Sequence, residues 1–150
     1  MRLYLTQHGK AMTEEQDPER PLTAEGEADV RRVIELAPAF GRITAWRLVH
    51  SGKARARQTA ELWANALGLP VEPADGLAPM DDPAIWAERL ASESTDVMLA
   101  GHLPHLARLT SLLVVGDADR AVVAFQPAGL VMLESSPQGW TVGLVLPPAG

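Results

Sequence analysis

The sequence predicts an α/β domain of three layers, in which a mostly parallel central sheet is covered by helices on both faces. Three strand-like runs each end at a turn and are followed by a helical pattern, and this alternation is typical of parallel sheets with crossover helices. The composition supports one core, because 150 residues with 47% hydrophobic and 21% charged residues are ordinary for a globular domain. We therefore expect residues 1–150 to form a single domain.

The first strand–turn–helix unit begins with a strand over residues 2–7, where side chains alternate in character. Gly9 follows the strand and lets the chain turn where a side chain would obstruct it. After a polar, proline-marked loop over 13–22, Thr23 can cap a helix that reaches about Ala37.

The second unit is predicted as a strand over residues 46–50, followed by turn residues at Ser51 and Gly52. A helix then runs through about Leu67. Its apolar stripe recurs at helical spacing, at Ala56, Ala60, Trp63 and Leu67.

The third unit follows a loop-rich stretch and a short helix over 84–90. Its strand is predicted at 96–100, and Pro104 suits the first position of a helix that reaches about Val115. Three closing strands are predicted at 121–125, 130–134 and 140–146.

The charge balance excludes several classes of partner. With a net charge of -6 and a pI of about 5.1, the molecule repels nucleic acid and anionic membrane surfaces. The absence of cysteine rules out disulfides and thiolate metal sites and fits a reducing compartment. The apolar stretches are too short to span a bilayer, and the N-terminus has no signal-peptide pattern. We expect a cytoplasmic protein.

Histidines mark the ends of all three predicted strands. His8, His50 and His102 fall where strands give way to turns. In sheets of this kind, sites gather beyond the carboxyl ends of the strands. The pattern therefore predicts a shared pocket.

Three segments around this predicted pocket share a family pattern; they read LTQHGKA at 5–11, SGKARARQTAE at 51–61 and GHLPHL at 101–106. Together they resemble the histidine phosphatase superfamily. The closer likeness is to its SixA-like branch of phosphohistidine phosphatases, because further segments look like that branch, at 17–23, 76–82 and 125–134. The resemblance covers nearly the whole chain and implies a phosphatase that uses neither metal nor cofactor.

The resemblance implies a role for three residues: His8 as the nucleophile, His102 as the second pocket histidine and Arg55 as the phosphate-binding arginine. A neutral imidazole can attack phosphorus with one ring nitrogen if a backbone carbonyl holds the proton of the other. Arg55 offers a charged fork to two phosphoryl oxygens, and His102, protonated beside the dianion, holds a third. Helical spacing alone does not separate Arg55 from Arg57; the family pattern falls on Arg55 and leaves Arg57 as a solvated charge.

Gln7 stands where the family pattern has an arginine. Its amide can still donate to a phosphoryl oxygen, so we expect it to bind phosphate, but the lost charge is worth roughly ten- to a hundredfold in rate. Lys10 or Arg20 is expected to supply the missing charge and to contact substrate. For Arg20, a salt bridge with Glu19 or Asp17 is the alternative.

The sequence offers no compelling general acid, since Asp81 and Asp82 are candidates only by their loop location. This favours a phosphohistidine substrate, because imidazole leaves readily once protonated whereas an alkoxide needs a strong acid. The spacing of His102 and His105 suggests a metal site, but Pro104 weakens that reading and no third ligand is evident, so no metal is expected. His50 and His105 are expected beside the pocket rather than as catalysts.

Three functional hypotheses follow. The first is dephosphorylation of a phosphohistidine protein, such as a phosphotransfer domain, through a covalent phosphohistidine on His8. The second is hydrolysis of a small phosphomonoester, which the short chain disfavours because it leaves little for a large lid. The third is a non-catalytic phosphate or phosphohistidine reader, in which Gln7 has removed the activity.

Overall fold

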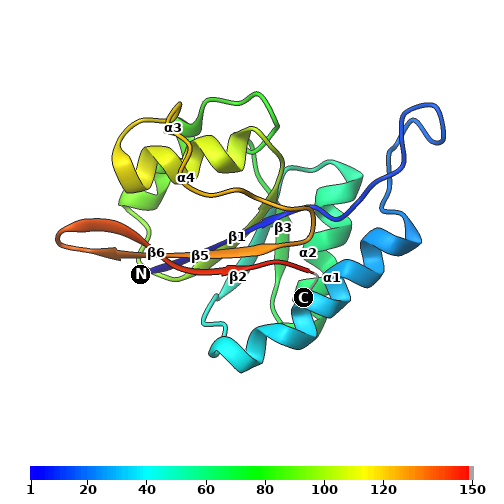
Figure 1. The fold of residues 1–150 in the computed structure, drawn as a ribbon, viewed down its shortest axis with the longest axis horizontal. Coiled ribbons are helices and arrows are strands. Elements are labelled where there is room, and N and C mark those ends of the chain that lie inside the picture. The colour runs from blue at the N-terminus through cyan, green and yellow to red at the C-terminus, as the bar shows by residue number, and fades with distance from the viewer. Residues whose placement is uncertain (149–150) are drawn as a thin grey trace.

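A computed structural model describes residues 1–148, in which a six-stranded sheet lies between two layers of helices (Figure 1). The last two residues of the predicted domain, 149 and 150, lie outside the described residues. The strands follow the order β3-β2-β4-β1-β5-β6 across the sheet. Their bounds are Arg2–Gln7 (β1), Arg47–His50 (β2), Val71–Pro73 (β3), Val97–Gly101 (β4), Leu130–Ser136 (β5) and Gly139–Leu146 (β6).

The strands β1 to β4 are parallel to one another. At one edge of the sheet, β5 pairs antiparallel with β1, and β6 pairs antiparallel with β5. The helices are α1 at Ala24–Leu36, α2 at Ala54–Leu67, α3 at Pro83–Ala91 and α4 at His105–Val115, with a short 3-10 helix, η1, at Ala37–Phe40. Helices α1 and α2 cover one face of the sheet, and α3 and α4 cover the other (Figure 1). The predicted α/β architecture is therefore confirmed.

Strand β1 shows how the two faces are built. Tyr4 points to the layer of α1 and α2, whereas its neighbours Leu3 and Leu5 point to the layer of α3 and α4. All three are buried, as expected for a central strand with a period of two. The burial on both faces keeps the strand ends at fixed positions, and the site depends on those positions.

Most element boundaries follow the capping residues of the sequence. Thr23 caps α1 as predicted, because its side-chain oxygen accepts a hydrogen bond from the amide of Gly26 at 3.0 Å. Gly68 ends α2 in a left-handed conformation, with φ of 67°. None of the helices in residues 1–148 is both long and apolar enough to cross a membrane.

Three predicted features differ from the structure. Residues 121–125 form no strand; their apolar character arises because Val123 and Phe125 pack on the core of the α3–α4 layer. The loop-rich stretch contains the short edge strand β3, which is exposed and so lacks an apolar alternation. Helix α4 begins at His105, so Pro104 is the cap residue before the helix and not its first residue.

Candidate active site

Three neighbouring strands place Ser51, His102 and His8 in a row. Strand β4 lies between β2 and β1, and the register pairs His50 with Ala100 on one side and Gln7 with Gly101 on the other. The next residues of the three strands therefore leave the sheet side by side. The predicted meeting of His8 and His102 at the carboxyl ends is borne out, with their ring centroids 5.0 Å apart.

The backbone around His8 is held from three sides. The amide of His8 donates to the carbonyl of Gly101 at 3.0 Å, and the amide of Gly9 donates to Oγ1 of Thr59 at 3.1 Å. A Cβ on Gly9 would come within 2.8 Å of the Gly26 carbonyl oxygen, so only glycine allows this close approach to α1. These contacts fix the position of the His8 side chain.

The ring of His8 has one defined tautomer. Its Nδ1 lies 2.7 Å from the carbonyl oxygen of Gly9, and because a carbonyl only accepts, Nδ1 carries the proton. Burial lowers the pKa of His8, the hydrogen bond to Gly9 opposes this, and the charges of Arg55 and Arg20 lower the pKa further. The ring is therefore neutral near pH 7, with a bare Nε2, which is the form a nucleophile needs.

His102 is almost completely buried, with 1% of its surface exposed. Its Nε2 lies 2.6 Å from Oγ of Ser51, and its buried Nδ1 has no partner among the described residues. Burial lowers the pKa of His102 to about 3, and the neighbouring His8 and Arg55 contribute to the shift. With only protein groups around it, His102 is neutral; the protonated form expected from the sequence would require the charge of a bound dianion.

Arg55 and Arg57 have different surroundings on the same helix. Arg57 is exposed and lies 3.5 Å from Glu61, one turn along α2. Arg55 is partly buried, and its Nε is buried without a partner among the described residues. Burial and the charge of Arg20 lower the pKa of Arg55 below its ordinary value, but a guanidinium remains protonated. A charged fork is thus available beside His8.

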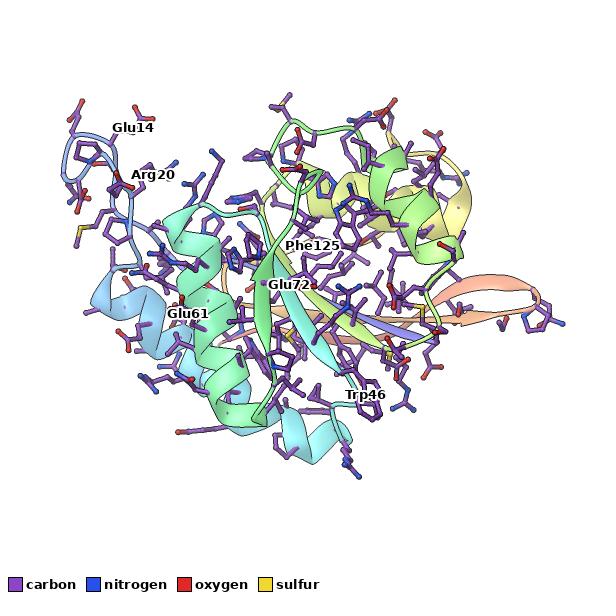
Figure 2. All side chains as sticks on the ribbon, turned by 180° about the vertical axis from the view of Figure 1, so that it is seen from behind. Glu14, Arg20, Trp46, Glu61, Glu72 and Phe125 are labelled. Carbon is purple, nitrogen blue, oxygen red and sulfur yellow. The ribbon has the colours of Figure 1, made fainter. Side chains whose placement is uncertain are left out.

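Lys10 and Arg20, the two candidates for the charge that Gln7 lacks, have different surroundings. Lys10 is exposed and its Nζ forms an ion pair with Glu25 at 2.6 Å. Arg20 lies on the loop beside the start of α2 (Figure 2), where its charge lowers the pKa of both His8 and Arg55. Its Nε donates to the carbonyl of Met12 at 3.0 Å, and within residues 1–148 it forms no ion pair.

Gln7 precedes the nucleophile at the end of β1. Its backbone carbonyl accepts from the amide of Ala128 at 3.0 Å, which ties this strand end to the loop before β5. The amide oxygen of its side chain is buried and has no partner in the described part of the chain. Gln7, Arg55 and His102 therefore bring unpaired polar atoms to the same end of the sheet.

The remaining candidates lie beside this group. His50 is buried, and its Nδ1 accepts from the amide of Gly52 at 3.0 Å, so it supports the turn into α2. His105 is fully buried at the start of α4. Asp81 accepts from the amide of Ala78, and Asp82 caps α3. Among residues 1–148, no cluster of three metal-ligating side chains is found.

Two contributors to the site were not assigned from the sequence. Thr59 is buried and links α2 to the His8 loop, since its hydroxyl donates to the carbonyl of Arg55 and accepts from Gly9. In the sequence, Thr59 is a polar residue on the apolar stripe of its helix, four residues after Arg55, and this could have indicated a role in the site. Ser51 was read only as a turn residue, because its contact with His102 spans 51 positions.

The comparisons with known proteins agree with this geometry. The sequence model of the histidine phosphatase superfamily (branch 1) matches residues 3–89, more than half of the chain. His8 and Arg55 lie inside the matched range, and His102 lies beyond it. No curated protein sequence gives a significant match.

Solved structures share the fold over nearly the full length. The protein histidine phosphatase SixA, solved in complex with tungstate, is 23% identical, with a TM-score of 0.81 and coverage of 99% of this chain and 97% of that one. A protein from Agrobacterium tumefaciens assigned as a phosphohistidine phosphatase SixA is 25% identical, with a TM-score of 0.80 and coverage of 99% and 98%.

The alpha-ribazole phosphatase from Shigella flexneri is 16% identical, with a TM-score of 0.78 and coverage of 99% of this chain and 98% of that one. Structural similarity therefore extends to phosphatases of different substrates. The fold, the histidine–arginine site and the match over residues 3–89 lead to one conclusion: this chain belongs to the histidine phosphatase superfamily.

Proposed function

We propose that this protein is a phosphohistidine phosphatase that removes phosphate from a histidine of a protein substrate, without a metal or cofactor. The observation that carries the proposal is the hydrogen bond from Nδ1 of His8 to the carbonyl of Gly9. It leaves Nε2 as the nucleophilic nitrogen, next to a positively charged group at the carboxyl end of the sheet.

In the first step, Nε2 of His8 attacks phosphorus, and the bond from phosphorus to the substrate imidazole breaks. The leaving imidazole takes up a proton, and the phosphoryl group is now on His8. In the second step, water attacks the same phosphorus, the bond to Nε2 breaks, and inorganic phosphate leaves with the oxygen of that water, whose two protons stay on the phosphate or pass to solvent. Nδ1 keeps its proton on the Gly9 carbonyl through both steps, so loss of the phosphoryl group from Nε2 returns His8 to its starting tautomer.

Four side chains are proposed to hold the phosphoryl oxygens. Arg55 provides a charged fork, and Arg20 adds the charge that Gln7 lacks, since it acts on both His8 and Arg55. His102 and Gln7 complete the set as neutral donors. Lys10 is engaged by Glu25 and is left outside this set, although a contact with a large substrate stays a prediction.

The acidic loop after β3 supports phosphohistidine over a phosphate ester. The carboxylate of Asp81 accepts from Ala78, and its charge acts on His105 and not on His8. A cavity of about 380 Å³ opens beside Ser51 and includes both Asp75 and Asp81 in its lining. Because no carboxylate charge within residues 1–148 acts on His8, an alkoxide leaving group has no evident acid beside the nucleophile, and this favours imidazole, which departs neutral or protonated.

The test is phosphate release from a phosphotransfer protein phosphorylated on histidine. We expect wild type to release phosphate, and brief incubation followed by intact-mass analysis to detect an acid-labile phosphoryl group on the enzyme. His8→Ala removes the nucleophile and should lower turnover by at least roughly a thousandfold. His50→Asn is the matched control, since His50 also ends a strand but supports only the turn. Unchanged turnover in His8→Ala would contradict the mechanism.

The same assay separates the two other hypotheses. Faster turnover of sugar phosphates than of the phosphorylated protein would assign the protein to the small phosphomonoesterases. Tight phosphate binding without turnover, together with activity that arises only in Gln7→Arg, would identify a non-catalytic reader.

A further inference from the structure

The pocket histidine His102 has a hydrogen-bond partner that lies on the neighbouring strand. Oγ of Ser51 is 2.6 Å from Nε2 of His102, and the amide of Lys53 donates to the same Oγ at 3.3 Å. We infer that Ser51 is a positioning residue, which donates its hydroxyl proton to Nε2 of His102 and thereby keeps the ring proton on Nδ1. Its effect on turnover rests on the proposed function.

The number of protons around this pair supports the assignment. A neutral imidazole has one N–H, and His102 is neutral because burial and the adjacent positive groups oppose its protonation. If that proton were on Nε2, it would be donated to Oγ of Ser51, and His102 would have no N–H left to donate to a phosphoryl oxygen. If it is on Nδ1, the ring keeps one free donor, and Nδ1 is the buried atom that has no protein partner in residues 1–148.

The hydroxyl of Ser51 is itself best satisfied in this arrangement. It accepts from the Lys53 amide and donates to His102, so that one hydroxyl uses both capacities. In the opposite arrangement it would accept from both groups, and its own proton would have no partner among the described hydrogen bonds. The first arrangement uses both capacities of the hydroxyl within the protein and is therefore preferred.

The fold holds Ser51 in place for this contact. Ser51 follows His50, which pairs with Ala100 two residues before His102. The turn after Ser51 is fixed from both sides, because the amide of Gly52 donates to His50 and the carbonyl of Lys53 accepts from the amide of Arg57 in α2. Ser51 also lines the cavity of about 380 Å³, so a methyl group added at this position has open space.

The direct test is the tautomer of His102, measured on ¹⁵N-labelled protein by long-range ¹H–¹⁵N correlation at neutral pH. We expect the Nδ1–H form in wild type and in Ser51→Thr, which keeps the hydroxyl, and a mixed or Nε2–H form in Ser51→Ala. Ser92→Ala, which removes an exposed hydroxyl at the end of α3, is the control and should leave the spectrum unchanged. An Nε2–H form in wild type, or an unchanged tautomer in Ser51→Ala, would overturn the inference.

Kinetics on the phosphorylated phosphotransfer protein add a second measurement. We expect kcat of Ser51→Ala to fall roughly tenfold, as for the loss of one well-placed hydrogen bond, and Ser51→Thr to restore most of it. A role in stability alone would lower the melting temperature and leave the tautomer as it is.

The two proposals fail in different ways. If wild type releases no phosphate from any substrate, the proposed function fails, while the tautomer measurement still decides the role of Ser51. If wild type turns over and Ser51→Ala keeps the Nδ1–H form, the inference fails and the proposed function stands.

Discussion

The two ends of the central sheet treat their polar groups in opposite ways. At the amino end, Asp96 accepts from the backbone amide of Arg2 at 2.7 Å and from the hydroxyl of Thr44. Thr44 in turn lies 3.2 Å from the hydroxyl of Tyr4. These bonds join the starts of β1 and β4 to the segment that leads into β2, so that three strands are tied together where they begin.

At the carboxyl end of the same strands, buried polar atoms have no protein partner. Gln7 Oε1, Arg55 Nε and His102 Nδ1 are all in this state among the described residues. Each unpaired buried group costs about 1–3 kcal/mol, so the arrangement opposes stability. The comparison indicates that the amino end serves folding, whereas the carboxyl end keeps Nε of Arg55 and Nδ1 of His102 free for an anion; the amide oxygen of Gln7 can only accept.

After His8→Ala, Arg55→Ala should have the largest effect on activity. Loss of a charge-assisted fork should lower kcat/KM about a hundredfold, which corresponds to about 2.7 kcal/mol. Its matched control, Arg57→Ala, should stay within about twofold, since Arg57 is exposed beside Glu61. The melting temperature of Arg55→Ala should not fall. A large loss of stability would contradict the view that polar groups at the carboxyl end serve the site and not folding.

Asp96→Ala should show the reverse behaviour. The free energy of unfolding should fall by about 2 kcal/mol, because the Arg2 amide and the Thr44 hydroxyl lose their shared acceptor. Phosphatase turnover below the melting temperature should stay near wild type. Urea unfolding and steady-state kinetics on the same sample measure both, and Asp96→Asn, which keeps one acceptor oxygen, should be intermediate.

Arg20→Ala tests whether a loop residue replaces the charge that Gln7 lacks. We expect kcat/KM to fall about tenfold, or about 1.4 kcal/mol, because Arg20 adds a second positive charge to a site that keeps Arg55. Lys10→Ala is the control, since its charge is already paired with Glu25. Equal losses in the two variants would show that the effect is one of net charge and not of position.

Acid should destabilise the protein through its four histidines, which lie at or beside the carboxyl ends of the strands. Burial lowers the pKa of all four histidines from 6.5, so that below that pH the unfolded chain binds protons which the folded chain does not. Stability is therefore lost as the pH falls below about 6.5, and for His102 this continues to about pH 3.

The test compares unfolding free energies at pH 7 and pH 6 by urea titration. His102→Asn should lose less stability over this interval than wild type, by roughly 0.7 kcal/mol. Thr44→Val, at the amino end, should keep the wild-type difference between the two pH values. An unchanged difference in His102→Asn would mean that His102 titrates alike in the folded and unfolded chain.

Local sequence determined most of the elements, because their signals act over a few residues. Thr23 caps α1, and Trp63 and Ala60 recur on the buried face of α2. The sequence predicted a strand at 121–125 that does not form and missed β3 at 71–73, since strand pairing depends on which sheet edge is free. Phe125 is apolar because it packs on the core, and Val71 is in a strand because it lies beside β2.

The sequence by itself determined the α/β class and the histidines at the strand ends; the family pattern chose Arg55 over Arg57, and its role in the site stays a prediction. Only the tertiary structure decided that His8 carries its proton on Nδ1, that Ser51 contacts His102, and that Lys10 is paired while Arg20 acts on the site. The physical reason is range. Periodicity and capping are local, whereas proton positions and pKa values depend on groups that strand order brings together from distant parts of the chain.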